Sequence, residues 1–457
     1  MSARVRAAAG AARAAGSLSR LTGRGGGTTV PGHVLMRLAP TALGELAALL
    51  PDGTVAVSAT NGKTTTSAML AHILAADRVV CRNGAGANLL SGIASTLVHQ
   101  PDDAEVGVLE VDEAALPAVV DAVRPRAIVL GNLFRDQLDR HGELEMVADR
   151  WRAMVAGLAG ETTLVLGADD PVIDALGEGR ERVVRYGIDD PDVALEHADA
   201  AADSTFCVRC GTAYAYDTTY FGHLGAYRCP NGDHARGALD FAARAIRPQG
   251  IEGTVFRVDG PTGAVDVTLP LPGLYNVENA LGALAAAYVL GVDPATAAQR
   301  LAGFSAAFGR FERIAVDGRE LVVILFKNPA GANEALRAIA RDVDGAQVLL
   351  ALNDGVADGR DVSWIWDIDI EGRLDGAAAI TCSGRRAADM ALRLRYADIP
   401  VDSIGRMVDL GDALDDVIAA AQPGDRVYAL ATYTAMLELH GVLSDRGLTA
   451  PFWEDGR

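Results

Sequence analysis

The stretch that decides the fold runs from Thr54 to Thr66 and reads TVAVSATNGKTTT. The apolar run TVAVSAT predicts a β-strand, and the text that follows Thr64 predicts a helix directly behind it. A loop at a helix N-terminus offers backbone N–H groups to phosphates, and a lysine adds a charge for the outer phosphates. We therefore expect a nucleotide-binding loop made by Thr60, Asn61, Gly62, Lys63, Thr64 and Thr65.

This loop departs from the eight-residue P-loop pattern, because the first glycine of that pattern would fall at Val57. A polar helix cap after a strand is the alternative interpretation. Lysine usage favours the functional one: only two of the 41 basic residues, Lys63 and Lys327, are lysines. A chain so rich in arginine is expected to keep lysine where a compact ammonium is required.

Length and composition bound the remaining possibilities. At roughly 150 residues per domain, 457 residues predict about three domains. The formal net charge of −19 argues against nucleic acid as the main partner. The longest apolar stretch, residues 280–292, is too short to cross a membrane as a helix.

Strand-like and helical segments alternate on both sides of the loop, which predicts an α/β fold with a mainly parallel sheet. We expect a basic N-terminal helical segment at 1–44 and an ATP-binding domain at 45–315. An acidic stretch and a cysteine cluster mark an insertion in that domain at about 189–249. A new series of strands predicts a second, C-terminal α/β domain at 316–457.

The N-terminal segment carries six arginines and no acidic residue before Glu45. Its helical text is interrupted by Arg13, which argues against a secretion signal. We expect either a helix packed on the acidic body or a basic face resting on anionic lipid. The odd number of cysteines and the lack of a secretion signal predict a cytoplasmic protein, with peripheral membrane association as an option.

Three of the five cysteines predict a small zinc site in the insertion. Cys207 and Cys210 form a C-x-x-C pair, and Cys229 follows after eighteen residues. Two ligands from one turn and two from another, joined by tetrahedral zinc, can stabilise an insert that lacks its own core. A fourth cysteine is missing, so His234 is the preferred fourth ligand, with Asp233 and His223 as alternatives. Cys81 and Cys382 are expected to be buried small side chains.

Acidic residues at strand ends are candidate magnesium ligands. Glu110, Asp112 and Glu113 follow one strand in VLEVDE, and Asp136 follows another. Ligand sites in open α/β sheets lie at the carboxyl ends of the strands. Glu110 is the preferred ligand, and the hydroxyl of Thr64 is the second.

Seven segments in order now resemble the Mur ligase family, ATP-dependent enzymes that join an amine to a carboxyl group in peptidoglycan precursors. They span residues 55–313 and read SATNGKTTT, NGAGAN, LEVDE, NLFRDQLDRHGE, GADDP, LPGLYNVENALGALAAA and FGRFERI. The cysteine cluster, LFKNPAGANE and NDGVADGRDVSWIWD further resemble one branch, the MurT-type subunits of lipid II isoglutaminyl synthases. The fold this resemblance implies is a central P-loop domain with a zinc-ribbon-like insertion, plus the C-terminal domain.

The departures from amino-acid-adding Mur ligases are informative. The family glycine before the loop is Ala59, Gln137 stands in place of a histidine after Asp136, and no lysine occurs between Arg135 and Phe326. The tract that ends His-Asn-Pro in the family reads ILFKNP, with Lys327 in the histidine place. These losses concern the metal and the amino acid, so we expect an amine that needs no amino-acid pocket.

By resemblance, the reaction is ATP-dependent amidation of the D-glutamate α-carboxyl of lipid II to D-isoglutamine through an acyl phosphate. Asn276 would lie near the adenine, Arg310 would reach the phosphates, and Lys63 and Lys327 would act in catalysis. A separate GatD-type glutaminase would supply ammonia from glutamine, with Asp361 orienting its catalytic histidine across the interface. The alternatives are a Mur or folylpolyglutamate-type amino-acid-adding ligase and a non-catalytic nucleotide-binding scaffold.

Overall fold

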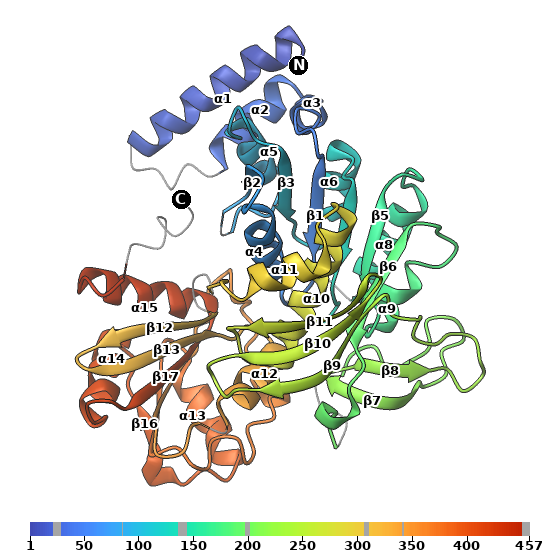
Figure 1. The fold of residues 1–457 in the computed structure, drawn as a ribbon. Helices are drawn as coiled ribbons and strands as arrows, with labels where there is room; N and C mark the ends of the chain where they lie inside the picture. The colour runs from blue at the N-terminus through green and yellow to red at the C-terminus, as the bar shows by residue number, and fades with distance from the viewer. Residues whose placement is uncertain are drawn as a thin grey trace.

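The fold is that of a computed structural model, which describes residues 1–457 except 22–28, 85, 136–143, 197–201, 306–309, 341 and 450–457. At residues 20, 21 and 310 it describes the backbone alone. Two α/β domains, each built on its own sheet, make up most of the molecule (Figure 1). In the described residues, no helix is long and apolar enough to span a membrane.

The first sheet has nine strands in the order β11-β10-β9-β6-β5-β4-β1-β3-β2. All neighbours from β2 to β9 pair in parallel, and β9, β10 and β11 pair antiparallel. The strands are β1 (Thr54–Ser58), β2 (Val80–Arg82), β3 (Val106–Glu110), β4 (Ala127–Leu130), β5 (Thr163–Gly167), β6 (Val183–Ile188), β9 (Phe241–Pro248), β10 (Thr254–Gly260) and β11 (Gly263–Leu269).

Helices cover both faces of this sheet, as the alternation of side chains along each strand requires. In β1, Val55 and Val57 join the core under α4 (Lys63–Leu74), α10 (Leu274–Val289) and α11 (Pro294–Leu301), whereas Ala56 joins the core on the opposite face. That opposite face carries α1 (Ala3–Leu21), α2 (Val30–Leu38), α3 (Ala42–Ala47), α5 (Leu90–Val98), α6 (Leu116–Val123), α8 (Leu144–Ala156) and α9 (Pro171–Ala175).

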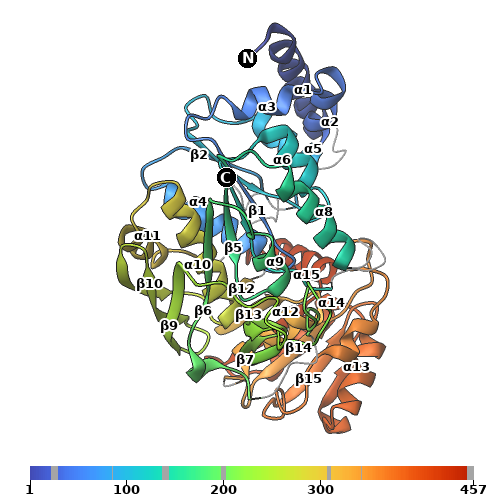
Figure 2. The same ribbon diagram turned by 90° about the vertical axis from the view of Figure 1, so that its right-hand side faces the viewer.

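The second sheet has six strands in the order β12-β13-β17-β14-β15-β16 and is parallel except for β12 and β13. Figure 2 shows this domain beneath the first. The strands are β12 (Arg310–Val316), β13 (Arg319–Leu325), β14 (Gln347–Ala351), β15 (Ala379–Ser383), β16 (Ile404–Arg406) and β17 (Arg426–Ala431). One face packs on α12 (Pro329–Ile339) and α13 (Ala387–Tyr396), and the other on α14 (Leu410–Ala420) and α15 (Tyr433–Asp445).

The start of the second domain and the end of the insertion each differ from the expected position by one strand or less. β12 begins at Arg310, six residues before the expected start of the second domain. The expected insertion included β9, yet β9 pairs with β6 and belongs to the nine-stranded sheet. Phe241 and Ala243 are buried in the core of that sheet, a tertiary contact that the weak local pattern does not predict. The excursion therefore ends near Asp240 and holds the hairpin of β7 (Ala215–Phe221) and β8 (Leu224–Arg228).

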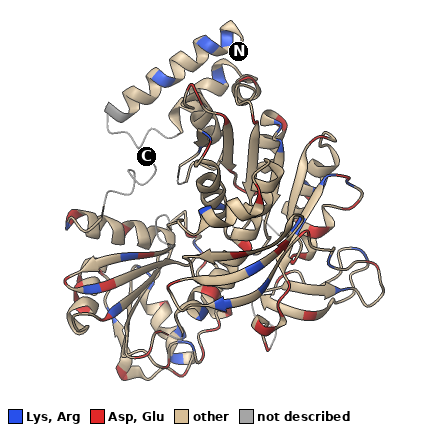
Figure 3. Cartoon of the chain, in the orientation of Figure 1, with Lys and Arg blue, Asp and Glu red and all other residues tan. Residues whose placement is uncertain are grey.

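The basic N-terminal segment packs on the nine-stranded domain. Helix α1 lies on α2, and α2 lies on α5. Two arginines of α1 bond to backbone carbonyls of the body: Arg4 Nε to Leu38 O at 3.0 Å and Arg13 Nε to Val98 O at 2.8 Å. Figure 3 shows α1 with basic and no acidic residues along its described length.

Candidate active site between two sheets

The loop after β1 is fixed to the end of the neighbouring strand β4. Asn132 does this with its side chain, which accepts from Asn61 N at 2.9 Å and donates to Asn61 O at 3.1 Å. Its carbonyl also accepts from Thr60 N at 2.9 Å. The Thr60 hydroxyl accepts from Phe134 N at 3.1 Å. Four hydrogen bonds therefore set the loop conformation before any ligand binds.

The turn from this loop into α4 requires glycine at position 62. Gly62 has φ of 90°, in the left-handed region, and a Cβ there would lie 1.9 Å from Asn279 Oδ1. Asn279 in turn accepts from Thr66 Oγ1 at 3.1 Å and donates to Asn276 Oδ1 at 3.2 Å. Both asparagines are buried on α10, so their amides hold the start of α4.

Lys63 is the first residue of α4, and its ammonium is held by two acceptors. Its Nζ lies 3.0 Å from Ala59 O and 3.1 Å from Glu113 Oε2. Burial alone would raise the pKa of Glu113, but the positive charges of Lys63 and Lys327 lower it. Glu113 therefore stays ionised and carries the counter-charge of this part of the site.

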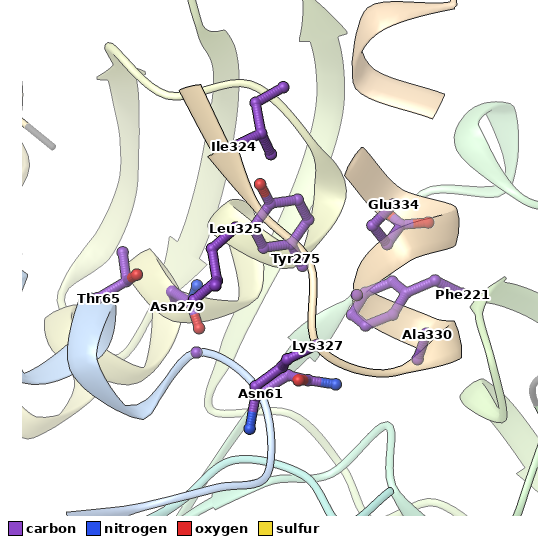
Figure 4. A pocket seen from close by; sticks show the side chains of 12 residues that line it. Asn61, Thr65, Phe221, Tyr275, Asn279, Ile324, Leu325, Lys327, Ala330 and Glu334 are labelled. Atoms are coloured by element: carbon purple, nitrogen blue, oxygen red, sulfur yellow. The ribbon is translucent and has the colours of Figure 1, made fainter. Parts of the chain in front are cut away.

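A pocket lies between the two domains, and its empty volume, which includes open solvent at its mouth, is about 670 Å³. Lys327 and Asn61 approach one another here from the loops after β13 and β1 (Figure 4). The side chains of Asn61 and Asn328 exchange two hydrogen bonds, at 2.9 and 3.4 Å. We call it the interdomain pocket; its lining is Asn61, Gly62, Thr65, Phe221, Tyr275, Asn279, Ile324, Leu325, Lys327, Ala330, Gly331 and Glu334.

Glu110 is buried at the end of β3, beside β1. Its backbone pairs with the side chain of Asn83, at 2.8 Å in both directions, and its Oε1 lies 3.5 Å from Asn88 Nδ2. Carboxylate and hydroxyl oxygens are hard ligands that suit Mg²⁺. Glu110 and Thr64, on the strand end and the helix start, are therefore chemically suited to hold that ion.

Three other predicted positions have limited descriptions. The backbone of Arg310 begins β12, but its side chain lies outside the described part of the chain. Asp136 and Gln137 lie outside the described residues altogether. Ala59 is buried, and its methyl group packs toward Gly131, where an added Cβ would lie 2.9 Å away. The methyl group thus fills the space between strand ends.

The insertion brings its three cysteines together. The sulfur atoms of Cys207, Cys210 and Cys229 all lie within 4.8 Å of one another, with Cys210 and Cys229 at 3.5 Å. Sulfur ligands of tetrahedral zinc lie roughly 4 Å apart, so three thiols in this arrangement could hold a metal ion. The carboxylate of Asp233 lies 4.0 Å from the Cys229 sulfur.

The expected fourth ligand, His234, does not join this cluster. Its Nδ1 lies 2.6 Å from the Tyr214 hydroxyl, and its Nε2 faces Glu178 at 3.8 Å. The other histidine considered, His223, is buried against Asp170, with Nε2 3.2 Å from its carboxylate. Both imidazoles have partners outside the cluster, whereas Asp233 lies near one of its three sulfur atoms.

Asp361 lies in the loop between β14 and β15 and is exposed. Its Oδ1 accepts from Ser363 N at 2.8 Å at the start of the short helix Ser363–Asp367. This backbone hydrogen bond, followed by the Ser363 hydroxyl, lowers the pKa of Asp361. The carboxylate is ionised and accessible from outside the chain.

The remaining cysteines are buried, as expected. Cys81 is 3% exposed and Cys382 is fully buried. Burial raises the pKa of Cys81 to about 11 and that of Cys382 to about 12. Neither thiol has the depressed pKa of a nucleophile.

Comparisons with known proteins agree with this architecture. Family profiles match residues 57–227 as a Mur ligase middle domain and residues 325–436 as a MurT ligase C-terminal domain. The subunit MurT of lipid II isoglutaminyl synthase (glutamine-hydrolyzing) from Streptococcus pneumoniae is 32% identical over 94% of both chains. The chain belongs to the MurT family. The predicted resemblance and the predicted α/β fold are therefore confirmed.

Two solved structures share the fold of this MurT-family chain. A pseudomurein peptide ligase type C from Methanothermus fervidus has a TM-score of 0.67 at 20% identity, covering 86% of this chain and 78% of its own. The MurF ligase of Thermotoga maritima, in complex with ADP, has a TM-score of 0.65 at 15% identity, covering 91% and 84%.

Sequence reasoning missed some residues that build this MurT-family site. Asn132 and Asn328 both stood inside quoted segments, NLFRDQLDRHGE and ILFKNP, without a role. Glu113 was considered with its neighbours and passed over for Glu110. The sequence did show that Glu113 lies three residues after the end of a strand, where loop residues of a parallel sheet gather. Its contact with Lys63 is visible only in the structure.

The first prediction concerns the turn into α4. Gly62→Ala should lower the free energy of unfolding by the cost of a left-handed alanine, about 1–2 kcal/mol, plus about 1–3 kcal/mol for the clash with Asn279. Gly291→Ala is the matched control, because Gly291 has φ of 86° and no atom within 4 Å of the added Cβ. Urea denaturation of both variants measures the difference. Equal losses would contradict the Asn279 contact.

Proposed function

We propose that this chain is an ATP-dependent ligase that amidates the D-glutamate α-carboxyl of lipid II. Family membership supports the reaction class, because the MurT relative is named as a subunit of lipid II isoglutaminyl synthase. The observation that carries the proposal is that Lys327 lines the interdomain pocket together with Asn61 and Gly62, the loop residues directly before Lys63. One lysine comes from each domain.

The chemistry of the reaction explains why positive charge is needed at this site. A carboxylate oxygen is a poor leaving group, so the carboxylate first attacks the γ-phosphorus of ATP and ADP departs. Ammonia then attacks the acyl phosphate carbon, inorganic phosphate leaves, and the ammonium proton passes to solvent. The loop N–H groups, Lys63, Lys327 and Arg310 would neutralise the phosphate charge in the first step. Mg²⁺, held by Glu110 and Thr64, would add charge stabilisation at the phosphates.

Addition of an amino acid in place of ammonia is not favoured. The chain has no lysine between Arg135 and Phe326 that could be carbamylated, and Lys327 occupies the family histidine position. The non-catalytic scaffold is less consistent with a pre-formed loop and two converging lysines. Amidation with ammonia uses every feature of the pocket without a site for an incoming amino acid.

The MurT relative is named as one subunit, which supports the existence of a partner. We propose a GatD-type glutaminase, with Asp361 reaching its catalytic histidine. An exposed, ionised carboxylate could hold the tautomer of that imidazole and stabilise its protonated form. Because lipid II is a membrane lipid, the complex would work at the membrane surface. The exposed Arg6 and Arg37 are the basic side chains that could face anionic lipid.

We also propose that Cys207, Cys210 and Cys229 hold zinc, with Asp233 as the fourth ligand. Three thiolates and one carboxylate are compatible with a tetrahedral zinc site. The ion would stabilise the β7–β8 hairpin, whose own buried cluster is small: Cys207, Tyr214, Tyr227 and Cys229. Its role would be structural, because the cluster lies on the hairpin and contributes nothing to the lining of the interdomain pocket.

Lys63→Ala tests the proposed phosphoryl transfer. The variant should lose amidation by about 10²-fold or more, even when free ammonium replaces glutamine, because a charge at the developing phosphate is removed. Mass spectrometry of lipid II after incubation with ATP measures the exchange of OH for NH₂. Activity above about a tenth of that of the wild type would refute the assignment of this loop as the phosphate-binding loop.

Asp361→Asn separates ammonia supply from ligation. With the partner bound, this variant should lose glutamine-dependent amidation and partner glutaminase activity while it keeps activity with free ammonium. Co-purification of the partner is the control for an intact complex. Asp361 has another role if glutamine-dependent rates stay near wild type or if both activities fall equally.

Metal analysis tests the cysteine site. Purified protein should hold about one zinc per chain, and Cys207→Ser combined with Cys210→Ser should lose it. Asp233→Ala should weaken zinc affinity at least tenfold in competition with a chelator, and more than His234→Ala does. Protein prepared without chelator that contains no zinc would refute the site. A larger effect of His234→Ala would restore His234 as the ligand.

A further inference from the structure

Glu113 pairs with Lys63 at 3.1 Å, and the charge of Lys327 also lowers its pKa. Lys63 belongs to the nine-stranded domain and Lys327 to the six-stranded domain. Glu113 lies in the turn between β3 and α6, on the same domain as Lys63. Glu113 is therefore under the charge of two lysines, one from each domain.

The position of Glu113 is fixed by its surroundings. Its Oε2 lies 3.1 Å from Lys63 Nζ, and the two side chains are 12% and 11% exposed. The indole of Trp151, which is fully buried, donates to the Glu113 carbonyl at 2.9 Å. The turn cannot move away from Lys63 without breaking this buried contact. The carboxylate is therefore part of the built site and not a mobile surface charge.

Asn328, the next residue in the chain, places Lys327 near the loop that precedes Lys63. Asn328 exchanges two side-chain hydrogen bonds with Asn61, two residues before Lys63. Lys327 itself lines the interdomain pocket with Asn61 and Gly62 (Figure 4). Its charge also lowers the pKa of Glu113, against the opposing effect of burial. Lys327 therefore lies at the loop that precedes Lys63, and its charge acts on the Glu113 carboxylate.

Two ammonium groups near one another, partly removed from water, repel unless an anion offsets their charges. Glu113 supplies that anion in the nucleotide-free protein. The phosphates of a nucleotide are anions that the loop is expected to bind at the same lysines. Carboxylate and phosphate therefore compete for the same cations, and the ion pairs present before binding must be given up or shared.

We propose that Glu113 is a positioning residue that holds Lys63 and Lys327 in the nucleotide-free enzyme and releases them to the phosphates when ATP binds. This inference rests on the proposed function in so far as the site binds ATP. It adds a residue that keeps the two domains together between turnovers. It also predicts that the carboxylate weakens nucleotide binding, so that ADP can leave.

Glu113→Gln tests this directly, because glutamine keeps the shape and the hydrogen bond from Lys63 but removes the charge. The dissociation constant for ADP, measured by calorimetry, should fall about tenfold or more, as expected when an opposite charge within about 4–6 Å of a cation is lost. The same variant should have a lower KM for ATP together with a lower kcat, because product release becomes slower.

Asp121→Asn is the matched control. Asp121 lies on α6, the helix that follows the same turn, and is exposed. Its substitution should leave the affinity for ADP unchanged. A similar gain in both variants would mean that net charge alone changes affinity, and it would overturn the specific role of Glu113.

A second pair of variants covers the case in which Glu113→Gln does not fold. Combining Glu113→Gln with Lys327→Gln restores the charge balance, and this double variant should still bind ADP more tightly than Lys327→Gln alone. The gain should be smaller than in the wild-type background, because one of the two cations is gone. No gain, or weaker binding, in every background that folds would overturn the proposal. Wild-type protein that binds neither ADP nor ATP would instead overturn the proposed function.

Discussion

Asn61 is held from two sides, and the geometry of the whole site depends on it. Its backbone is fixed by the side chain of Asn132 at the end of β4. Its own side chain pairs with Asn328, whose Oδ1 also accepts from Gly331 N at 2.9 Å and caps α12. One loop residue therefore connects the nine-stranded sheet to the first helix of the other domain. The interdomain pocket exists because both connections are made at once.

Each domain has its own apolar cores, and the contacts between the domains combine polar pairs with apolar contacts. Ile251, in the turn between β9 and β10, is buried in the core of the six-stranded domain. Beside it, Ile251 N donates to Asp342 Oδ2 at 3.2 Å. The Asn61–Asn328 pair holds the domains together at the pocket, and Ile251 holds them together at the turn after β9.

The sequence predicted what depends on local pattern. The parallel sheets, the loop at Asn61 and the helix that begins at Lys63 follow from strand and helix periodicity and from glycine at position 62. The end of the insertion was misplaced because β9 is recognised only through its pairing with β6. The zinc ligand His234 was expected from its spacing after Cys229, but spacing does not reveal that Tyr214 holds the imidazole. Contacts between distant segments were the part that local patterns could not supply.

The rarity of lysine is the exception, since it marked two residues 264 positions apart with no motif in common. Lys63 shows why arginine does not serve there. Its ammonium bonds to Ala59 O, four residues earlier in the chain, and to Glu113 at the same time. A compact point charge can meet both acceptors at about 3 Å, whereas the larger, planar guanidinium would extend into the space where phosphates are expected. Composition could single out the two cations, but only the fold shows that Glu113 pairs with one of them and is under the charge of both.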